Sequence, residues 1–361
     1  MARGYLVLED GSVFEGELFG NERGTEGEVV FSTGMDGYQE SLTDPSFRGQ
    51  ILIFTYPLVG NYGVSDDFFQ SETVHTRGLV VREYCKNPSP MYGGHCIDEF
   101  LKKYDVPGIS GIDTREIVRK ISSLGTIKGA IVTEGTDIES TIRHLKEMPA
   151  PSKGNLVGEV VEGGIARYDN GKELTVGLID CGTKSGIVRD LCSRFNVVRF
   201  PYDTPADVII ESGVKGVLIS NGPGDPMHPA IMSTTVKTAS DLAGELPLYG
   251  ICFGSQILAL AFGGNTYKMK FGHHGCNQPV KYEGRVFITS QNHEFAVDAH
   301  SLEGTGLVAD QINVNDGSVE GVRHTDLPIF TTQYHPEASP GPLDTTFLFD
   351  KFGKMVKEGR L

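Results

Sequence analysis

The feature that most constrains this chain is a single cysteine between two glycines, in the run Gly-Ile-Cys-Phe-Gly at 250–254. An apolar segment, 247–249, precedes the run, and a helix-like apolar pattern over 256–260 follows it. Such a turn holds a nucleophile in a strained conformation at the end of a strand, and the glycines allow close packing. The N-terminus of the following helix favours the thiolate. A small buried hydrophobic cysteine is the alternative, but the glycine frame favours a nucleophile.

A base for this thiol is predicted in the run Gln-Tyr-His-Pro-Glu at 333–337. If the segment ends a strand, His335 and Glu337 project from the same face, so that the carboxylate can orient the imidazole. Pro336 cannot donate to a sheet ladder and should mark where strand pairing stops. Taken alone, the motif is also compatible with a solvated strand end. Together with Cys252 it predicts a triad in the order Cys, His, Glu.

A third element, the turn Ser-Asn-Gly-Pro-Gly-Asp-Pro at 220–226, follows the apolar run 216–219. Acyl transfer from a cysteine passes through tetrahedral oxyanions, and a glycine-rich turn can present unobstructed N–H groups to them. We expect one donor from this turn to act with the backbone amide of Phe253. A phosphate cradle is the competing interpretation. The segment has neither the lysine and Ser/Thr of a P-loop nor the three-glycine dinucleotide spacing.

From residue 174 onward, strand-like and helix-like segments alternate. The alternation predicts an α/β domain with a doubly wound, mostly parallel sheet, helices on both faces, and a ligand site at the carboxyl ends of the strands. The first half reads as a smaller α+β domain with helical patterns over 99–103 and 115–122. Between the halves, Pro, Gly, Ser and charged residues dominate. We therefore predict an N-terminal domain at 1–147, a linker at 148–172 and a C-terminal domain at 173–361.

Composition and charge argue against a nucleic-acid-binding, a membrane-spanning or a secreted protein. The formal net charge of −15 argues against a nucleic-acid partner, and no apolar run approaches the roughly 20 residues needed to cross a bilayer. The first four residues are too short for a signal peptide, so a cytoplasmic protein is expected. None of the six cysteines forms a C-x-x-C pair. His273, His274, Cys276 and His293 show no ligand spacing of a known zinc site, so no metal site is predicted.

These elements, in this order, resemble the class I triad glutamine amidotransferases. Further motifs narrow the resemblance to the small, glutaminase subunit of carbamoyl phosphate synthetase, over nearly the whole chain. In the N-terminal half they are the segments 8–11, 37–40, 42–46, 55–57 and 112–115. In the C-terminal half they are the segments 220–226, 268–275, 291–293 and 335–342.

The resemblance implies that Cys252 is the nucleophile, His335 the acid/base and Glu337 its orienting partner. It also implies a set of glutamine-binding residues: Ser46, Gly222, Gly224, Phe253, Gln256, Asn292 and Phe295. Several positions depart from more familiar members of the family: Phe253, Tyr334 and Cys181, with little expected effect on the chemistry, and Ser255 and Glu294. Ser255 stands where histidine is frequent, and Glu294 stands where glycine is expected, which puts the local backbone conformation in doubt.

The resemblance further implies a glutaminase that delivers ammonia to a large, ATP-dependent synthetase subunit, for arginine and pyrimidine synthesis. No cofactor is expected in this chain, and ATP and Mg are expected on the large subunit. The N-terminal domain would dock that partner and contribute Ser46 to the glutamine site. Two alternatives stay open: a stand-alone cysteine amidase or peptidase, and a non-catalytic scaffold of the same fold.

Overall fold

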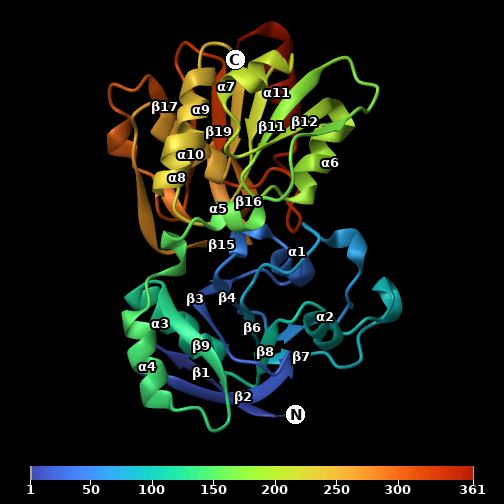
Figure 1. Cartoon of the computed structure of the whole chain (residues 1–361), viewed down its shortest axis with the longest axis vertical. Coiled ribbons are helices and arrows are strands. Elements are labelled where there is room, and N and C mark those ends of the chain that lie inside the picture. The colour runs from blue at the N-terminus through green and yellow to red at the C-terminus, as the bar shows by residue number, and fades with distance from the viewer. Residues whose placement is uncertain (1, 361) are drawn as a thin grey trace. The chain divides into compact units, whose positions relative to one another are not determined.

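The computed structural model describes residues 2–360 and divides the chain into two compact units, which are labelled by element in Figure 1. The first unit comprises Met1–Gly154 and Lys270–Gly275, and the second comprises Asn155–Met269 and Cys276–Leu361. Each unit is described by itself.

The first unit is built on a closed barrel of seven strands, in the order β1-β2-β8-β6-β4-β3-β9. The strands are β1 (Arg3–Leu8), β2 (Val13–Gly20), β3 (Thr25–Ser32), β4 (Gln50–Phe54), β6 (Gly78–Val80), β8 (Pro107–Ser110) and β9 (Ile127–Thr133). Strand β4 is buried on both faces, because Ile51 and Ile53 join one apolar cluster while Leu52 and Phe54 join another. The sequence predicts an α+β domain here but not the closure of its strands into a barrel.

Short helices and one further pair of strands complete the first unit. They are α1 (Tyr38–Leu42), α2 (Ile97–Lys103), α3 (Thr114–Leu124), α4 (Ile138–Glu147), β5 (Leu58–Val59) and β7 (Glu83–Tyr84). Helix α3 begins where the Asp113 side chain accepts a hydrogen bond from the N–H of Glu116 at 3.1 Å, and it ends at Gly125. The helical patterns at 99–103 and 115–122 thus correspond to α2 and α3, each slightly longer than predicted.

A ten-stranded sheet, in the order β10-β12-β11-β13-β14-β19-β18-β17-β15-β16, belongs to the second unit except for Lys270–Gly275, which the first unit includes. The strands are β10 (Ala166–Tyr168), β11 (Thr175–Asp180), β12 (Asn196–Pro201), β13 (Val217–Ile219), β14 (Leu248–Ile251), β15 (Thr266–Tyr282), β16 (Arg285–Val297), β17 (Leu307–Asn313), β18 (Val319–His324) and β19 (Ile329–Thr332). The five neighbouring strands β12, β11, β13, β14 and β19 are parallel. Antiparallel strands flank them on both sides, β10 beside β12 and β18 beside β19. The predicted α/β class with a mostly parallel sheet is confirmed.

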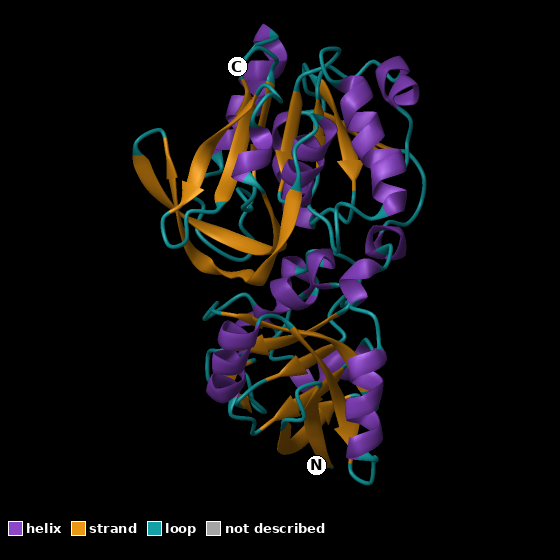
Figure 2. Cartoon of the chain, turned by 90° about the vertical axis from the view of Figure 1, so that its left-hand side faces the viewer, coloured by secondary structure: helices purple, strands orange, loops and turns teal. Residues whose placement is uncertain are grey.

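Helices pack on both faces of this sheet, as Figure 2 shows for the strands and helices of the second unit. The helices are α6 (Ser185–Arg194), α7 (Ala206–Glu211), α8 (Pro229–Ile231), α9 (Lys237–Leu242), α10 (Phe253–Ala261) and α11 (Phe347–Glu358). Alternate residues of β13 explain the two layers: Val217 and Ile219 pack with α7, α9 and α10, whereas Leu218 packs with α6 and α11. The sheet is therefore doubly wound.

The segment 148–172, predicted as a linker, contains regular structure. It holds the 3-10 turn Pro151–Lys153, helix α5 (Leu156–Val160) and strand β10, which pairs antiparallel with β12. The Asn155 side chain begins α5 by accepting a hydrogen bond from the N–H of Gly158 at 3.2 Å. Elements of three to five residues are too short to produce the apolar periodicity that sequence analysis relies on.

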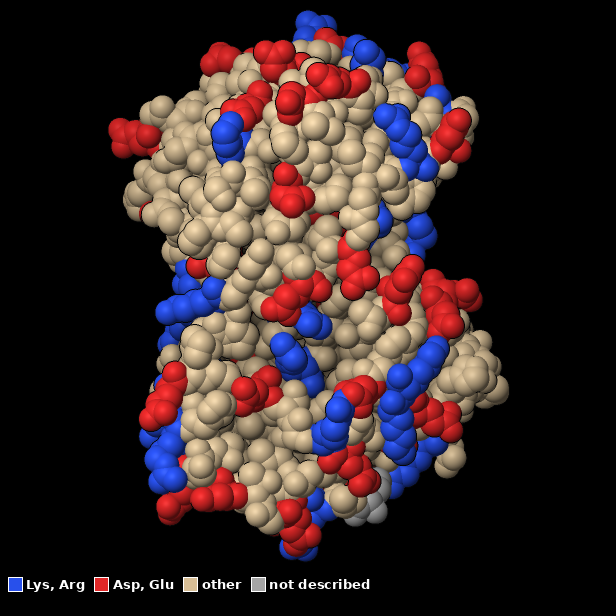
Figure 3. All heavy atoms as spheres, viewed as in Figure 1, with Lys and Arg blue, Asp and Glu red and all other residues tan. Residues whose placement is uncertain are grey.

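Acidic and basic side chains are interspersed over the face of the molecule that Figure 3 presents. Among residues 2–360, no helix combines the length and the apolar character needed to span a membrane.

Candidate active site

Cys252 occupies the sharp turn between β14 and α10. Its backbone has φ 54° and ψ −102°, a conformation that residues other than glycine rarely adopt. The residue is 2% exposed, so its thiol lies inside the second unit. Strain of this kind persists only where the surrounding structure enforces it, and it concentrates at functional sites. The structure thus places Cys252 in the strained strand-to-helix turn that the sequence predicts.

The two glycines that frame Cys252 are required by close backbone packing. A Cβ atom on Gly250 would lie 2.4 Å from the carbonyl oxygen of Gly254. A Cβ atom on Gly254 would lie 2.1 Å from the carbonyl oxygen of Ile219, on β13. Both distances are far shorter than a normal contact, so a larger residue at either position would displace the turn.

Strand β19 lies beside β14, which ends at the turn of Cys252, and leads the chain to His335. Strands β14 and β19 are parallel, with Ile251 opposite Thr332, and the Cys252 N–H donates to the Thr332 carbonyl at 2.7 Å. Three residues after Thr332, the His335 N–H donates to the carbonyl of Ser290 at 2.9 Å. Strand pairing therefore brings the thiol and the imidazole to the carboxyl edge of the sheet, where ligand sites of this architecture occur.

His335 and Glu337 form a buried pair. The Nδ1 atom of His335 lies 2.7 Å from Oε1 of Glu337, and the two side chains are 1% and 0% exposed. A carboxylate at Nδ1 makes that nitrogen the donor and leaves Nε2 as the acceptor of the neutral ring. Nε2 is buried and has no hydrogen-bond partner among residues 2–360. The ring can therefore take up a proton at Nε2.

Lys184, just before α6, is a charged group of this site that the sequence analysis did not predict. It is 2% exposed, its Nζ lies 3.1 Å from Oε1 of Glu337, and Nζ donates to the carbonyl of Ala338 at 2.6 Å. Its position four residues after β11 is a usable signal, because the carboxyl ends of parallel strands meet at one edge of a sheet. Nothing in the local sequence distinguishes it from the exposed lysines that are far commoner.

The charge state of Glu337 follows from these neighbours. Burial alone would raise the pKa of Glu337, but the Lys184 ammonium and His335 outweigh burial and lower the pKa from 4.5 to about 2. Asp310, a partly buried carboxyl of this unit, shows the opposite result: burial raises its pKa from 3.8 to about 6, against the charges of Lys351 and Arg323. Glu337 thus stays ionised at neutral pH and can stabilise an imidazolium.

The turn 220–226 is tied to the turn of Cys252. The carbonyl of Ser220 accepts a hydrogen bond from the Gly254 N–H at 3.0 Å. A Cβ atom on Gly222 would lie 2.4 Å from the carbonyl of Cys181, and Gly224 has φ 86°. In the described part of the chain, neither the N–H of Gly222 nor that of Phe253 donates a hydrogen bond to the protein. Uncommitted backbone donors of this kind can bind an oxyanion.

Three residues predicted to bind glutamine, Gln256, Asn292 and Phe295, lie in the second unit, and Asn292 contacts the thiol. The Cys252 thiol donates to the carbonyl of Asn292, with an Sγ···O distance of 3.6 Å. Gln256 lies on the first turn of α10, and its Nε2 donates to the carbonyl of Phe295 at 2.8 Å. All three residues are buried. Their binding of substrate remains a prediction.

Ser46, the remaining predicted glutamine contact, lies in the first unit. It belongs to the 3-10 turn Pro45–Phe47, and its N–H donates to Oδ1 of Asp44 at 2.9 Å. Its side chain is largely buried, at 7% exposure of the residue. A contribution of Ser46 to glutamine binding stays a prediction.

The departures at Glu294 and Ser255 are accommodated locally. Glu294 does not have a positive φ, so its backbone does not require glycine, and Lys268 Nζ lies 3.9 Å from its Oε1. Ser255 lies on α10, where its hydroxyl contacts that of Thr331 at 2.7 Å. A larger side chain at position 255 would have to replace this contact.

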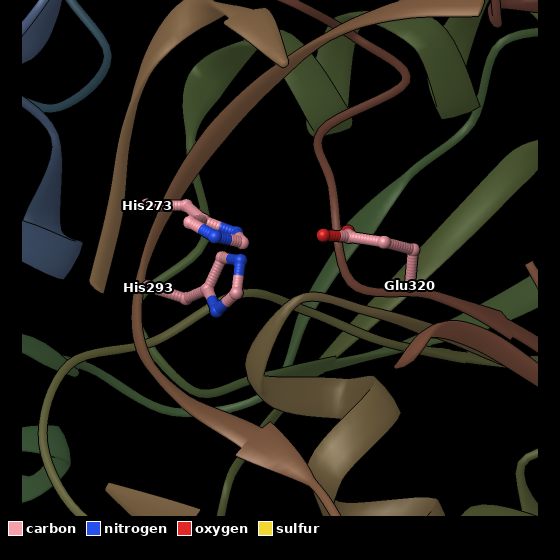
Figure 4. A group of neighbouring side chains, drawn as sticks. All are labelled: His273, His293 and Glu320. Atoms are coloured by element: carbon pink, nitrogen blue, oxygen red, sulfur yellow. The ribbon is translucent and has the colours of Figure 1, made fainter. Parts of the chain in front are cut away.

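Figure 4 labels three side chains of types that can bind metal ions: His273 on β15, His293 on β16 and Glu320 on β18. His293 and Glu320 are buried in the second unit and have protein partners there. Nδ1 of His293 lies 2.8 Å from the carbonyl oxygen of Phe295, and the Glu320 carboxylate accepts a hydrogen bond from Asn313 Nδ2 at 3.0 Å. Both side chains are thus hydrogen-bonded to protein groups inside the second unit. The expectation that the chain holds no metal stays a prediction.

Known proteins and family models match this chain over nearly its whole length. Residues 6–131 match the family model "Carbamoyl-phosphate synthase small chain, CPSase domain", and residues 177–355 match "Glutamine amidotransferase class-I". The "Carbamoyl phosphate synthase small chain" of Archaeoglobus fulgidus is 52% identical over 98% of this chain and 99% of its own length. The protein of the same description from Methanopyrus kandleri is 48% identical, over 99% of each chain. The "Carbamoyl phosphate synthase pyrimidine-specific small chain" of Bacillus subtilis is 45% identical over 98% of this chain and 95% of its own.

Proposed function

The chain belongs to the carbamoyl phosphate synthase small-chain family, and on that premise we propose that Cys252 hydrolyses glutamine and supplies the ammonia for carbamoyl phosphate synthesis. One observation carries the catalytic assignment. The strained turn of Cys252 is hydrogen-bonded to the strand that leads to the buried His335–Glu337 pair. The relatives do not favour a stand-alone cysteine amidase or a scaffold without activity.

The first chemical step transfers the thiol proton and forms a carbon–sulfur bond. His335 Nε2 accepts the proton of Cys252, and the sulfur attacks the side-chain amide carbon of glutamine. The amide oxygen becomes an oxyanion, for which the N–H groups of Gly222 and Phe253 are the available donors. The carboxylate of Glu337 stabilises the imidazolium that results.

The intermediate then collapses to a thioester. The carbon–nitrogen bond breaks, and the imidazolium of His335 gives its proton to the departing nitrogen, which leaves as ammonia. A water molecule, deprotonated by the same ring, attacks the thioester. The carbon–sulfur bond breaks, glutamate is released, and Cys252 regains its proton.

The synthesis itself is assigned to a partner. The turn 220–226 lacks the lysine and Ser/Thr of a P-loop, so ATP and Mg are assigned to a large synthetase chain that receives the ammonia. The description "small chain" of the relatives supports such a partner. The first unit would dock it and supply Ser46 to the glutamine site. The protein would act in the cytoplasm, in pyrimidine and arginine synthesis.

The test uses the chain assembled with its large partner. Carbamoyl phosphate formation is measured with glutamine and, separately, with ammonium as the nitrogen source, for the wild type and Cys252→Ser. We expect Cys252→Ser to lose the glutamine-dependent reaction and to keep the ammonia-dependent one, because only the source of ammonia is removed. Cys192→Ser, at a cysteine of α6 that lies outside the site, is the control and should retain both reactions.

Loss of the ammonia-dependent reaction in an assembled Cys252→Ser complex would contradict the proposed division of labour. Full glutamine hydrolysis by Cys252→Ser would contradict the assignment of the nucleophile. Glutamine hydrolysis that is equally fast with and without the large chain would favour the stand-alone amidase instead.

A further inference from the structure

Gln333, two residues before His335, contacts the sulfur of Cys252. Its Nε2 donates to Sγ with an N···S distance of 3.6 Å. The side chain is fully buried, and the Gln333 N–H donates to the carbonyl of Glu320 at 2.7 Å, which fixes the residue at the end of β19. The chemistry assigned to Cys252 and His335 makes no use of this contact.

A chain of hydrogen bonds fixes which end of the Gln333 amide faces the sulfur. Gln256 Nε2 donates to the backbone carbonyl of Phe295 at 2.8 Å and to Oε1 of Gln333 at 3.1 Å. A backbone carbonyl can only accept, so it selects the NH₂ end of Gln256. That NH₂ group in turn selects the oxygen of Gln333, and the NH₂ end of Gln333 is left facing Sγ.

We infer that Gln333 stabilises the thiolate of Cys252 through this N–H donor, an inference that rests on the proposed role of Cys252 as the nucleophile. A buried thiolate is costly unless it receives hydrogen bonds. The carbonyl of Asn292, 3.6 Å from Sγ, can only accept and therefore favours the protonated thiol. The contact from Gln333 Nε2 has the opposite polarity, because it donates to Sγ, and it favours loss of the proton to His335.

The same donor serves the end of the reaction. When the thioester breaks, the sulfur leaves as a thiolate and recovers its proton from His335. An N–H group facing Sγ stabilises the leaving sulfur just as it stabilises the attacking one. Gln333 therefore lowers the cost of the charged sulfur in both half-reactions.

The experiment measures the rate of Cys252 alkylation by iodoacetamide against pH, with the adduct quantified on the peptide that contains Cys252. The wild-type chain is compared with Gln333→Met, which keeps the length of the side chain and removes the donor. Gln311→Met is the matched control. Gln311 is 1% exposed, and its side chain donates to the carbonyl of Thr331 and accepts from the hydroxyl of Tyr334, at a distance from the sulfur in the hydrogen-bond network.

We expect the midpoint of the alkylation profile to rise by about one pH unit in Gln333→Met, so that alkylation below the midpoint is about tenfold slower. In Gln311→Met the midpoint should stay at the wild-type value. Glutaminase activity of the complex should fall in Gln333→Met and recover in part as the pH is raised. A merely structural role would lower the activity by the same factor at every pH.

An unchanged midpoint in Gln333→Met would overturn the inference. If that variant does not fold, Gln333→Glu provides the same comparison, because its oxygen can still accept from Gln256 while a second oxygen replaces the donor facing Sγ. Its midpoint should rise at least as far as that of Gln333→Met, and a midpoint at or below the wild-type value would overturn the inference. Absence of glutamine hydrolysis in the wild-type complex would contradict the proposed function instead.

Discussion

The two units bury polar groups for different purposes. In the second unit, buried side chains contact one another through specific atoms at the carboxyl edge of a parallel sheet: Gln333 contacts Cys252, and Glu337 contacts both His335 and Lys184. In the first unit, buried hydroxyls and carboxylates mostly satisfy the backbone, as when Asp44 accepts from the N–H of Ser46. Burial therefore does not identify chemistry. A contact between buried side chains that can carry a proton, such as His335 and Glu337, does indicate chemistry.

Substitution of His335, in the second unit, should have the largest effect on glutamine hydrolysis. His335→Asn removes the proton acceptor, and glutamine hydrolysis by the assembled complex should fall on the order of 10³-fold. Glu337→Gln should reduce it less, by roughly 10- to 100-fold, because Oε1 of the new amide can still accept from both His335 and Lys184. Steady-state rates with glutamine measure both changes. Equal losses in two folded variants would show that Glu337 does more than orient the ring.

The parts of this site that the sequence predicts are those encoded by short motifs. Cys252 lies between glycines that tight packing requires, and His335 and Glu337 are two residues apart at a strand end, so each pattern is visible locally. Gln333 also lies two residues from His335, and this alternation was a usable signal for a residue facing the same site. Its contact with the sulfur depends on the pairing of β14 with β19, which no local pattern encodes.

The first unit shows the same limit at the level of the fold. Its strands are recognisable as short apolar runs. Closure of the barrel depends on non-local pairs such as Leu6 with Ile131, between β1 and β9. Lys184 was missed for a related reason, since its burial depends on Glu337, which lies far along the chain. Resemblance to a family supplied the role of the first unit, because its residues carry no recognisable chemistry.

A second prediction tests whether the ion pair of the second unit is needed for its charge state. Lys184→Met leaves Glu337 buried without its ammonium partner, which should cost about 3 kcal/mol of stability at neutral pH and about tenfold in turnover. The wild-type pKa of Glu337, about 2, lies below its usual 4.5, so its stabilising contribution is present above pH 4.5 and is lost as the pH falls toward 2. The stability difference between the two proteins should narrow over that window.

Unfolding by denaturant at a series of pH values measures this difference. Lys237→Met is the control, because Lys237 forms an exposed pair with Asp241 on α9 and its loss should change stability by less than about 1 kcal/mol. A Lys184→Met protein as stable as the wild type at pH 7 would mean that the ammonium does not offset the burial of Glu337.

Substitution of Ser46 should have the smallest effect, and it tests whether the first unit also takes part in glutamine binding. If Ser46 of the first unit contributes to glutamine binding, Ser46→Ala should raise the KM for glutamine by about 5- to 10-fold, the loss of roughly one hydrogen bond. The ammonia-dependent reaction should not change. Ser41→Ala is the matched control, since Ser41 has the same 7% exposure in the same unit and its hydroxyl donates to the carbonyl of Gly37 at 3.0 Å. A change of KM in Ser46→Ala alone would show that the first unit takes part in substrate recognition, whereas identical behaviour of the two variants would restrict recognition to the second unit and leave the first with docking alone.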